Sequence, residues 1–256
     1  MQVVEPSSAR ELAEALREAA SSRRSIALCG AGTKQAMGGP LAGEVCISTR
    51  RLNRVVAYDP DDLTVSVEAG ISYAEFSRLL ALRRQMVPFD PPFAAGATIG
   101  GIVASNSSGP RRRFYGTARD MLIGMKFATL EGKIVESGGM VVKNAAGLDL
   151  GRLMIGSFGT LAAIVSANFR VFPIPPAWRT FLRPLPSLEA ALQERDRVLR
   201  SVLSPAALDL LNPEAARETG FRGYLLALEA GGSEAVLERY ARELAGWQAL
   251  GQQEAA

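Results

Sequence analysis

The chain has 256 residues and a mass of 27.3 kDa, which is enough for one large domain or two small ones with a buried core. With 48% apolar and 21% charged residues, its composition excludes collagen-like, coiled-coil and disordered proteins. We expect no transmembrane segment, because no run of about 18 apolar residues occurs, and no secretory signal. Two cysteines cannot form a disulfide framework, so we expect a cytoplasmic protein.

Histidine is absent from the sequence. This removes the commonest general base, the commonest metal ligand and one side chain through which flavins are attached covalently. Serine–histidine triads, zinc hydrolases and haem ligation by imidazole are therefore excluded, and no metal site is predicted. Any chemistry must come from a bound cofactor, from other side chains or from another subunit. The net charge of +3 and the pI near 9.1 permit an acidic partner without requiring one.

The chain up to residue 172 alternates short strands and helices irregularly, which predicts an α+β fold. Ser8 with Glu11, and Ser72 with Glu75, have the spacing of capping boxes, and each pair begins a helical pattern of apolar residues. Strands are expected at residues 25–29, 45–48, 55–58, 64–68, 121–130, 134–136 and 161–172.

Composition changes at the proline-rich segment from Pro173 to Trp178, which predicts a boundary between domains at 1–175 and 176–256. The second domain follows a β-α-β-β-α pattern, with expected elements at 181–185, 187–201, 208–211, 223–229 and 233–247. This is a small, truncated ferredoxin-like α+β unit that lacks one strand.

The first candidate site is the sequence GAGTK at residues 30–34, directly after a predicted strand. Glycines let backbone amides approach an anion closely, and Thr33 and Lys34 add further donors. The sequence matches neither a dinucleotide-binding fingerprint nor a Walker loop. A plain tight turn therefore remains an alternative.

The second candidate site is DPPFAAGATIGG at residues 90–101, continued by ASNSSG at 104–109. Thr98 is expected to cap a short helix whose first turn exposes several free amides, and such a turn can bind an anion. Ser105, Asn106, Ser107 and Ser108 add polar groups suited to a phosphate, a ribose or a heterocycle edge. A glycine-rich connection packed under a sheet is the alternative explanation.

The third candidate region joins residues 142–150 to 153–160. Asp149 is expected to cap a helix, and Gly156 and Gly159 would bring the backbone close to a ligand or reverse the chain. Taken alone, each of these pieces is typical of scaffold.

Seven motifs occur in a fixed order: GAGTK (30–34), DPDDLTVSVEAG (59–70), PFDPP (88–92), ATIGG (97–101), YG (115–116), KNAAGLD (143–149) and GSFGT (156–160). Together they resemble the FAD-binding domain of the vanillyl-alcohol oxidase (PCMH-type) flavoproteins over residues 1–175. The KNAAGLD segment is most similar to the FAD-binding subunit of glycolate oxidase.

The resemblance implies a two-lobed α+β domain with FAD between the lobes. It places the FAD pyrophosphate at residues 30–34 and 98–101. Along the ribityl chain and isoalloxazine it places Ser105, Asn106 and Gly109, with Gly116 near them. The adenine or flavin edge would lie at Gly159 and Ile164. The implied cofactor-binding residues are Gly30, Ala31, Gly32, Thr33, Lys34, Pro91, Ala97, Thr98, Gly100, Gly101, Ser105, Asn106, Gly109, Gly116, Gly159 and Ile164.

The sequence departs from this family in two respects. Several members attach the flavin through a histidine, so FAD is expected to be non-covalent here, and Cys29 and Cys46 are expected to be inert buried thiols. The second domain is shorter than the substrate-capping domain that the family usually carries, so no catalytic acid or base is assigned to this chain.

Residues 111–115, RRRFY, form the densest basic cluster. They could clasp a carboxylate or the flavin phosphates, dock an acidic partner, or form a solvated loop. Three arginines do not make a nucleic-acid-binding module, so no nucleic acid is expected.

The resemblance implies an FAD-dependent oxidoreductase component that acts on 2-hydroxy acids such as glycolate. The resemblance implies a hetero-oligomer with a homologous flavoprotein subunit and an iron–sulfur subunit, and any contact with a membrane would be peripheral and made through these partners. The alternative is a non-catalytic FAD-binding structural or electron-relay subunit that needs a homologous catalytic partner.

Overall fold

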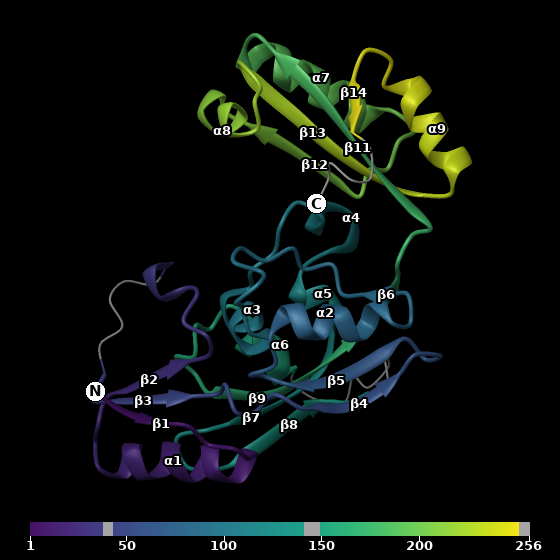
Figure 1. The fold of residues 1–256 in the computed structure, drawn as a ribbon. Coiled ribbons are helices and arrows are strands. Elements are labelled where there is room, and N and C mark those ends of the chain that lie inside the picture. The colour runs from purple at the N-terminus through teal and green to yellow at the C-terminus, as the bar shows by residue number, and fades with distance from the viewer. Residues whose placement is uncertain (38–42, 141–148, 251–256) are drawn as a thin grey trace. The chain divides into compact units, whose positions relative to one another are not determined.

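The computed structural model describes residues 1–37, 43–140 and 149–250, and it divides into two compact units (Figure 1). The first unit contains Met1–Gly109 and Thr117–Ile174, and the second contains Pro110–Gly116 and Pro175–Ala256. The sequence pattern assigns residues 110–116 to the first domain, whereas the structure groups them with the second unit.

The first unit begins with a parallel three-stranded sheet in the order β1 (Gln2–Val4), β3 (Val45–Ser48), β2 (Ile26–Cys29). Helix α1 (Ala9–Ser21) packs Leu12 and Leu16 against Ile47 of this sheet and Val165 of the neighbouring one. Strand β2 ends at Cys29, so the GAGTK sequence starts at the carboxyl edge of the sheet. The short 3-10 helix η1 (Gln35–Met37) follows that sequence.

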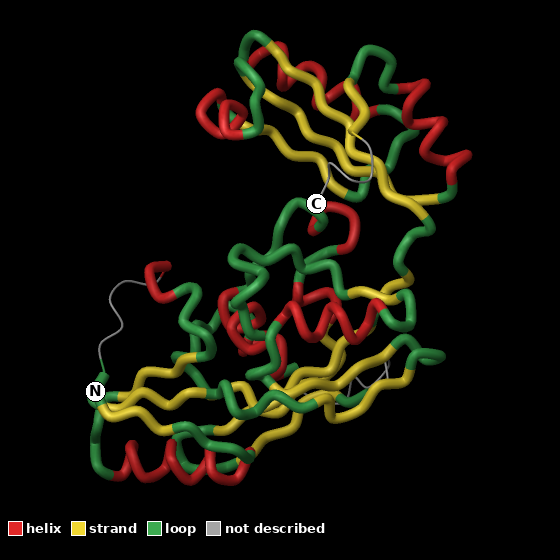
Figure 2. The backbone as a smooth tube through the Cα atoms, in the orientation of Figure 1, coloured by secondary structure: helices red, strands yellow, loops and turns green. Residues whose placement is uncertain are grey.

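The second sheet of this unit is antiparallel and has five strands in the order β4-β5-β9-β7-β8. Helices α2, α3, α5 and α6 lie on one side of it, and α1 lies on the other (Figure 2). Phe169 of this sheet packs against Phe76 and Phe89, with ring centroids 6.2 and 5.4 Å away. The elements are β4 (Val55–Asp59), β5 (Thr64–Glu68), α2 (Tyr73–Ala81), β6 (Gln85–Met86), α3 (Ile99–Ser105), α5 (Ala118–Met121), β7 (Leu122–Ala128), β8 (Ile134–Gly138), α6 (Leu150–Met154), β9 (Ala163–Arg170) and β10 (Phe172–Pro173).

The predicted helix caps are confirmed. Ser8, Ser72, Thr98 and Asp149 each accept a hydrogen bond from the backbone amide three residues later. The first capping box differs in one detail, because the Glu11 carboxylate accepts from the amide and hydroxyl of Ser7 rather than from Ser8. These two bonds lower the pKa of Glu11.

The second unit is a complete ferredoxin-like fold, with strand order β12-β13-β11-β14. Helices α7 and α9 cover one sheet face around Phe181 and Leu228, and α8 packs on the other around Leu225. The elements are α4 (Arg112–Tyr115), β11 (Ala177–Leu185), α7 (Leu188–Arg200), β12 (Ala207–Leu211), α8 (Pro213–Glu218), β13 (Tyr224–Gly232), α9 (Glu234–Glu243) and β14 (Gln248–Leu250).

The prediction that one strand is missing is wrong. Helix α9 ends at Glu243, and Gly246 takes a φ of 85° that turns the chain back toward the sheet. Residues 248–250 then pair with β11 as β14. The apolar periodicity continues to Trp247, which made the helix look longer than it is and hid a three-residue strand.

Arg111 has a structural role within the second unit. Its guanidinium donates two hydrogen bonds, of 2.8 and 2.9 Å, to the Glu229 carboxylate and lies 4.6 Å from the Trp178 ring centroid. Both charged side chains are about three-quarters buried. The pair therefore holds residues 110–116 on the sheet of this unit, whereas the neighbouring Arg112 is exposed.

We expect Arg111→Met to lower the free energy of unfolding by about 1–2 kcal/mol, since a bidentate, partly desolvated ion pair is worth more than an exposed one. Denaturant unfolding followed by tryptophan fluorescence measures the loss. Arg112→Met is the control and should change stability by less than about 0.5 kcal/mol. Equal stabilities of the two variants would contradict the assigned role. A double-variant cycle that combines Arg111→Met with Glu229→Gln measures the interaction free energy of this ion pair.

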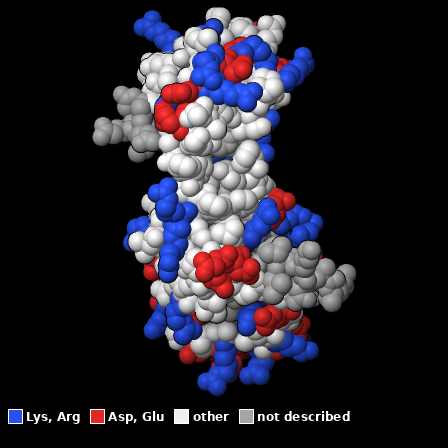
Figure 3. Space-filling model, turned by 90° about the vertical axis from the view of Figure 1, so that its right-hand side faces the viewer, with Lys and Arg blue, Asp and Glu red and all other residues white. Residues whose placement is uncertain are grey.

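Side chains of both charge signs occur on the face of the molecule shown in Figure 3. Among the described residues, no helix is long and apolar enough to cross a membrane.

Candidate functional site

The structure brings the two predicted glycine loops together in the first unit. Gly30 follows β2, and Thr98 is positioned by a bridge to Ser72 at the start of α2. A Cβ atom on Gly30 would overlap the Thr98 hydroxyl, so the two loops are in direct contact and only glycine fits at residue 30. The turn at residues 93–96 also reaches this place, because Gly96 lies next to the Thr33 methyl group.

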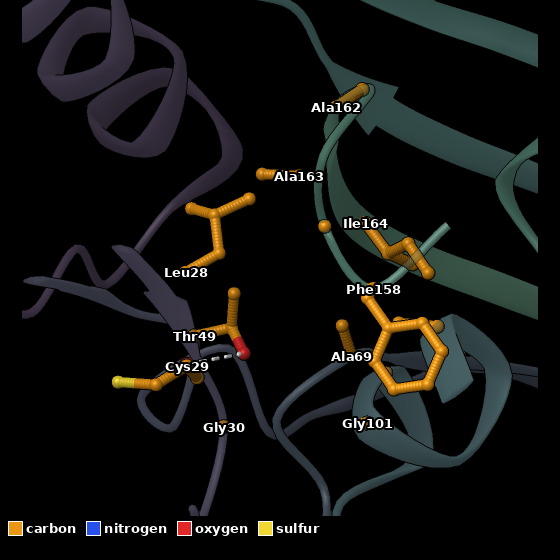
Figure 4. Close-up of a pocket in the computed structure, with 13 residues that line it drawn as sticks. Leu28, Cys29, Gly30, Thr49, Ala69, Gly101, Phe158, Ala162, Ala163 and Ile164 are labelled. Atoms are coloured by element: carbon orange, nitrogen blue, oxygen red, sulfur yellow. Dashed lines mark hydrogen bonds between the residues drawn. The ribbon is translucent and has the colours of Figure 1, made fainter. Parts of the chain in front are cut away.

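Two adjoining cavities open where these loops meet. The larger has a volume of about 370 Å³ and is lined by residues 30–35 together with Thr98, Gly101 and Ser105. The smaller, of about 80 Å³, lies between Leu28 and Thr49 on one side and Phe158 and Ile164 on the other (Figure 4). A third cavity of about 510 Å³ shares Leu28 and Gly159 with them. The two adjoining cavities thus combine apolar walls with polar groups at residues 30–35, Thr49, Thr98, Ser105 and Thr160.

The amides of the 30–34 loop are the donors of this site. Within the described part of the chain, none of these five amides donates to a backbone carbonyl, although the carbonyls of Gly32 and Lys34 accept bonds from Gln35 and Met37. Gly32 has a φ of 73°, which turns the loop back on itself. Among the described residues the loop therefore offers a row of N–H groups without a backbone acceptor at the edge of a cavity, a suitable arrangement for an anion.

The first turn of α3 is different, and the prediction that it exposes several free amides is wrong. The amide of Ile99 donates to the Ile71 carbonyl at 3.0 Å, and that of Gly100 donates to the Ala69 carbonyl at 2.7 Å. The Gly101 amide is taken by the Thr98 hydroxyl at 3.3 Å. The carbonyls of Ile71 and Ala69 belong to the β5–α2 turn, a long-range contact that the local sequence does not reveal.

Comparison with known proteins identifies the family of this fold. A family model described as "FAD binding domain" matches residues 1–138. The chain belongs to the FAD-binding domain family. The resemblance predicted from the seven motifs and the predicted cofactor, FAD, are both confirmed.

Several relatives of this FAD-binding chain are oxidases or dehydrogenases of hydroxy acids by name. The glycolate oxidase subunit GlcE of Escherichia coli is 35% identical over 184 residues, which cover 72% of this chain and 52% of the relative. The D-lactate dehydrogenase of Archaeoglobus fulgidus is 31% identical, with coverages of 83% and 48%. The chain spans about half the length of the curated relatives it matches.

Solved structures share the fold at low sequence identity. An alkyldihydroxyacetonephosphate synthase superposes with a TM-score of 0.81 at 22% identity, covering 97% of this chain and 52% of that one. A substrate-bound p-cresol methylhydroxylase gives a TM-score of 0.77 at 15% identity, with coverages of 99% and 58%. The predicted α+β, PCMH-type fold class is confirmed.

Most of the predicted cofactor-binding residues line the two adjoining cavities of this FAD-binding domain. They are Gly30, Ala31, Gly32, Thr33, Lys34, Thr98, Gly100, Gly101, Ser105, Gly159 and Ile164. The Ser105 hydroxyl donates to the Gly101 carbonyl at 2.6 Å and lies 2.6 Å from the Ser107 hydroxyl. Among the described residues, no cluster of three potential metal ligands occurs.

The other predicted residues do not line these cavities. Pro91 and Ala97 are buried, and Asn106 ends α3 in a left-handed conformation with a φ of 48°. Gly109 packs against Asp90 so closely that a side chain would overlap its backbone, and Gly116 ends α4 in the second unit. Residues 143–148 of the KNAAGLD motif lie outside the described residues.

Lys34 is the charged group of the larger cavity. Its Nζ lies 3.5 Å from the Thr33 hydroxyl, and burial lowers the pKa of its ammonium below the ordinary value of 10.5. A lysine that loses hydration on the wall of a cavity gains when an anion enters, because the anion restores the charge interactions that burial removed.

Phe158 lines both cavities, and the sequence analysis did not single it out. Its side chain is 50% exposed and its backbone has a φ of 52°, a conformation that bulky residues rarely adopt. The amide of Phe158 donates to the Ala104 carbonyl at 2.8 Å, which holds the strained backbone against α3. The signal in the sequence was an aromatic residue placed between Gly156 and Gly159.

Proposed function

We propose that this chain is the FAD-binding part of an oxidoreductase of 2-hydroxy acids, similar to a glycolate oxidase subunit, and that it holds FAD without a covalent bond. The observation that carries the proposal is the 30–34 loop, whose amides have no backbone partners within the described residues and which borders a cavity of about 370 Å³ in an FAD-binding domain. The sequence has no histidine for flavin attachment.

The groups around this loop fit the diphosphate of a dinucleotide. Successive amides and the Lys34 ammonium donate hydrogen bonds to phosphate oxygens, and each bond to a charged partner contributes about 1.5–3 kcal/mol. The apolar walls around Leu28, Phe158 and Ile164 suit the flat rings at the ends of the cofactor. Thr98 also lines the larger cavity.

When bound, the flavin supplies the redox chemistry by accepting a hydride from the carbon that bears the hydroxyl group. The role proposed for this chain is to fix the dinucleotide and to shield it from water. In this proposal the protein works in the cytoplasm within a hetero-oligomer, with a homologous flavoprotein subunit and an iron–sulfur subunit. The relatives named as separate glycolate oxidase subunits, GlcE and GlcD, support a multi-subunit complex.

A non-catalytic FAD-binding subunit is the second candidate function. Lys34 and Cys29 are the only side chains with acid–base groups among the described residues that line the two adjoining cavities, and neither is a carboxylate. A group that accepts the hydroxyl proton of a substrate would then come from elsewhere, including a homologous partner subunit.

A visible absorption spectrum of the purified chain, taken before and after acid precipitation, tests cofactor binding. The expected result is flavin absorption that passes into the supernatant, since non-covalent FAD is released when the protein unfolds. Flavin that stays in the pellet would contradict non-covalent attachment. A colourless protein that binds no added FAD would overturn the proposal.

Turnover separates the two candidate functions. The FAD-loaded chain is assayed with glycolate, D-lactate and D-2-hydroxyglutarate and an artificial electron acceptor, with and without a co-expressed homologous flavoprotein subunit. Activity of the chain alone supports the catalytic assignment. Bound FAD with activity only in the presence of the partner supports the non-catalytic one.

The pH dependence of diphosphate binding should depend on Lys34. A bound diphosphate raises the pKa of the ammonium, whereas burial lowers it in the cofactor-free chain. The affinity contributed by Lys34 is therefore complete below the lowered pKa and is lost as the pH rises through the pKa in the complex. Because the cofactor-free pKa lies below 10.5, the loss should begin below that pH.

Calorimetric titration with ADP measures this effect without the titration of a flavin ring. Lys34→Met should bind ADP about tenfold more weakly near neutral pH and should not show the alkaline loss. Lys34→Arg, whose charge persists, should keep its affinity to higher pH. If the ADP affinities of the wild type and of Lys34→Met depend on pH in the same way, the role of Lys34 is contradicted.

A further inference from the structure

Two thiols meet directly behind the 30–34 loop. Cys29 is the last residue of β2, and Cys46 lies in the neighbouring strand β3. Their sulfur atoms are 2.8 Å apart, and both cysteines are free. This separation is less than 1 Å longer than a covalent S–S bond of about 2.05 Å.

The strand register explains the meeting. In the parallel ladder Cys46 pairs with Ala27 and Cys29 pairs with Ser48, so Cys29 and Cys46 are diagonal neighbours whose side chains lie on one face of the sheet. The two sulfur atoms are therefore brought together by the backbone of two paired strands.

The two thiols differ in access. Cys46 is buried, whereas Cys29 is only half-buried and lines both adjoining cavities. The Cys29 sulfur points away from the other residues that line the smaller cavity (Figure 4). A small oxidant from the solvent therefore meets the partly exposed Cys29 before the buried Cys46, whose sulfur lies 2.8 Å away.

We propose that Cys29 and Cys46 form a reversible dithiol–disulfide site, oxidised by a peroxide. The Cys29 sulfur attacks one peroxide oxygen, the O–O bond breaks, and a sulfenic acid and one water form. The Cys46 sulfur then displaces the hydroxyl group, so that a disulfide and a second water are the products. Two thiols and one hydrogen peroxide thus give one disulfide and two waters, with two electrons passing from sulfur to oxygen.

The surroundings of the two thiols make the first oxidation of Cys29 slow and favour Cys46 as its partner in the disulfide. Burial is the main cause that raises the pKa of the Cys29 thiol to about 12, and Cys46 and the Glu5 carboxylate add to the rise while the Ser48 hydroxyl opposes it. Because little of Cys29 is in the thiolate form near neutral pH, its reaction with an external oxidant or disulfide is slow. Once a sulfenic acid forms, the Cys46 sulfur is already in place, and the second step is intramolecular.

The disulfide should also act on the 30–34 loop, a consequence that rests on the proposed function. The carbonyl of Cys29 accepts a hydrogen bond from the amide of Thr49 at 2.9 Å and another from the Thr49 hydroxyl at 3.4 Å (Figure 4). Gly30 has no spare room against Thr98. A disulfide draws Cys29 toward Cys46 and so displaces the neighbouring backbone at Gly30, which is tightly packed against Thr98. We therefore expect the disulfide form to bind FAD about tenfold more weakly, because a binding geometry tolerates displacements of only about 0.5 Å.

The test treats the full, cofactor-free chain with hydrogen peroxide and counts thiols in denaturant. The expected result is loss of both thiols together, a cross-linked peptide joining residues 29 and 46, and full recovery with dithiothreitol. Cys46→Ser should lose the cross-link and accumulate oxygenated Cys29, and Cys46→Ala is the second variant should the first fail to fold. Two thiols that survive, or oxygen added to both sulfurs without a cross-link, would overturn the site.

Fluorescence titration with FAD then compares the two redox forms. Weaker binding by the disulfide form, reversed by dithiothreitol, supports the link to the 30–34 loop, and equal affinities overturn that link. Failure of both forms to bind FAD, with the cross-link still formed, would count against the proposed function and leave the redox site standing.

Discussion

Gly30→Ala is expected to lower the affinity for FAD about tenfold to a hundredfold. The added methyl group would overlap the Thr98 hydroxyl and lie against its Cβ and Cγ2 atoms. Thr98 is a stiff, buried side chain whose hydroxyl caps α3 through the amide of Gly101, so it cannot rotate away without losing that bond. The overlap is relieved only when the 30–34 loop moves, and overpacking of this kind costs about 1–3 kcal/mol.

A double-variant cycle makes this prediction specific. Thr98→Ala removes the overlapping oxygen at the cost of the cap, so Gly30→Ala combined with Thr98→Ala should bind FAD more tightly than the two separate losses imply. Gly151→Ala is the control, since a methyl group there meets only ordinary contacts at 3.5 Å or more. Flavin fluorescence titration gives the affinities. A Gly30→Ala chain that binds FAD as well as Gly151→Ala would refute the packing argument.

Local patterns were sufficient for much of the fold. Ser72, Thr98 and Asp149 were recognised as caps because each precedes an apolar helical repeat, and the strand at 64–68 was predicted with its observed bounds. Such features depend on neighbours within a few residues. Strand β14 was missed because its existence depends on pairing with β11, a contact with residues about 70 positions earlier.

The candidate site was predictable in composition but not in its hydrogen bonding. The glycines at 30–34 and 100–101 show that the backbone approaches something closely, yet at Gly100 that partner is the protein's own Ala69 rather than a ligand. The same limit applies to Arg111, whose partners Glu229 and Trp178 are distant in sequence. A glycine in the sequence indicates that some group approaches the backbone closely. Only the three-dimensional structure shows whether that group belongs to a ligand or to the protein itself.

Phe158→Ala is expected to weaken FAD binding about tenfold to a hundredfold. The ring is half exposed, lines both adjoining cavities and is held in a left-handed backbone conformation that costs about 1–3 kcal/mol. A planar ring of the cofactor that packs on this face would gain about 1–3 kcal/mol, the usual range for stacking of a base on an aromatic side chain. Phe158→Tyr preserves the ring and should bind like the wild type, whereas Phe158→Leu preserves only apolar bulk and should fall between them.

Two partial ligands decide which ring of FAD uses this surface. If the adenine packs against Phe158, ADP affinity should fall in Phe158→Ala as FAD affinity does, while FMN affinity should stay unchanged; the reverse pattern assigns the isoalloxazine. Phe93 supplies the matched control, because it is 65% exposed with a φ of 58° but lines neither of the adjoining cavities. Phe93→Ala should relieve a similar backbone strain with no loss of either ligand. Equal losses in both variants would mean that strain relief or a change in fold, rather than stacking, accounts for the effect of Phe158→Ala.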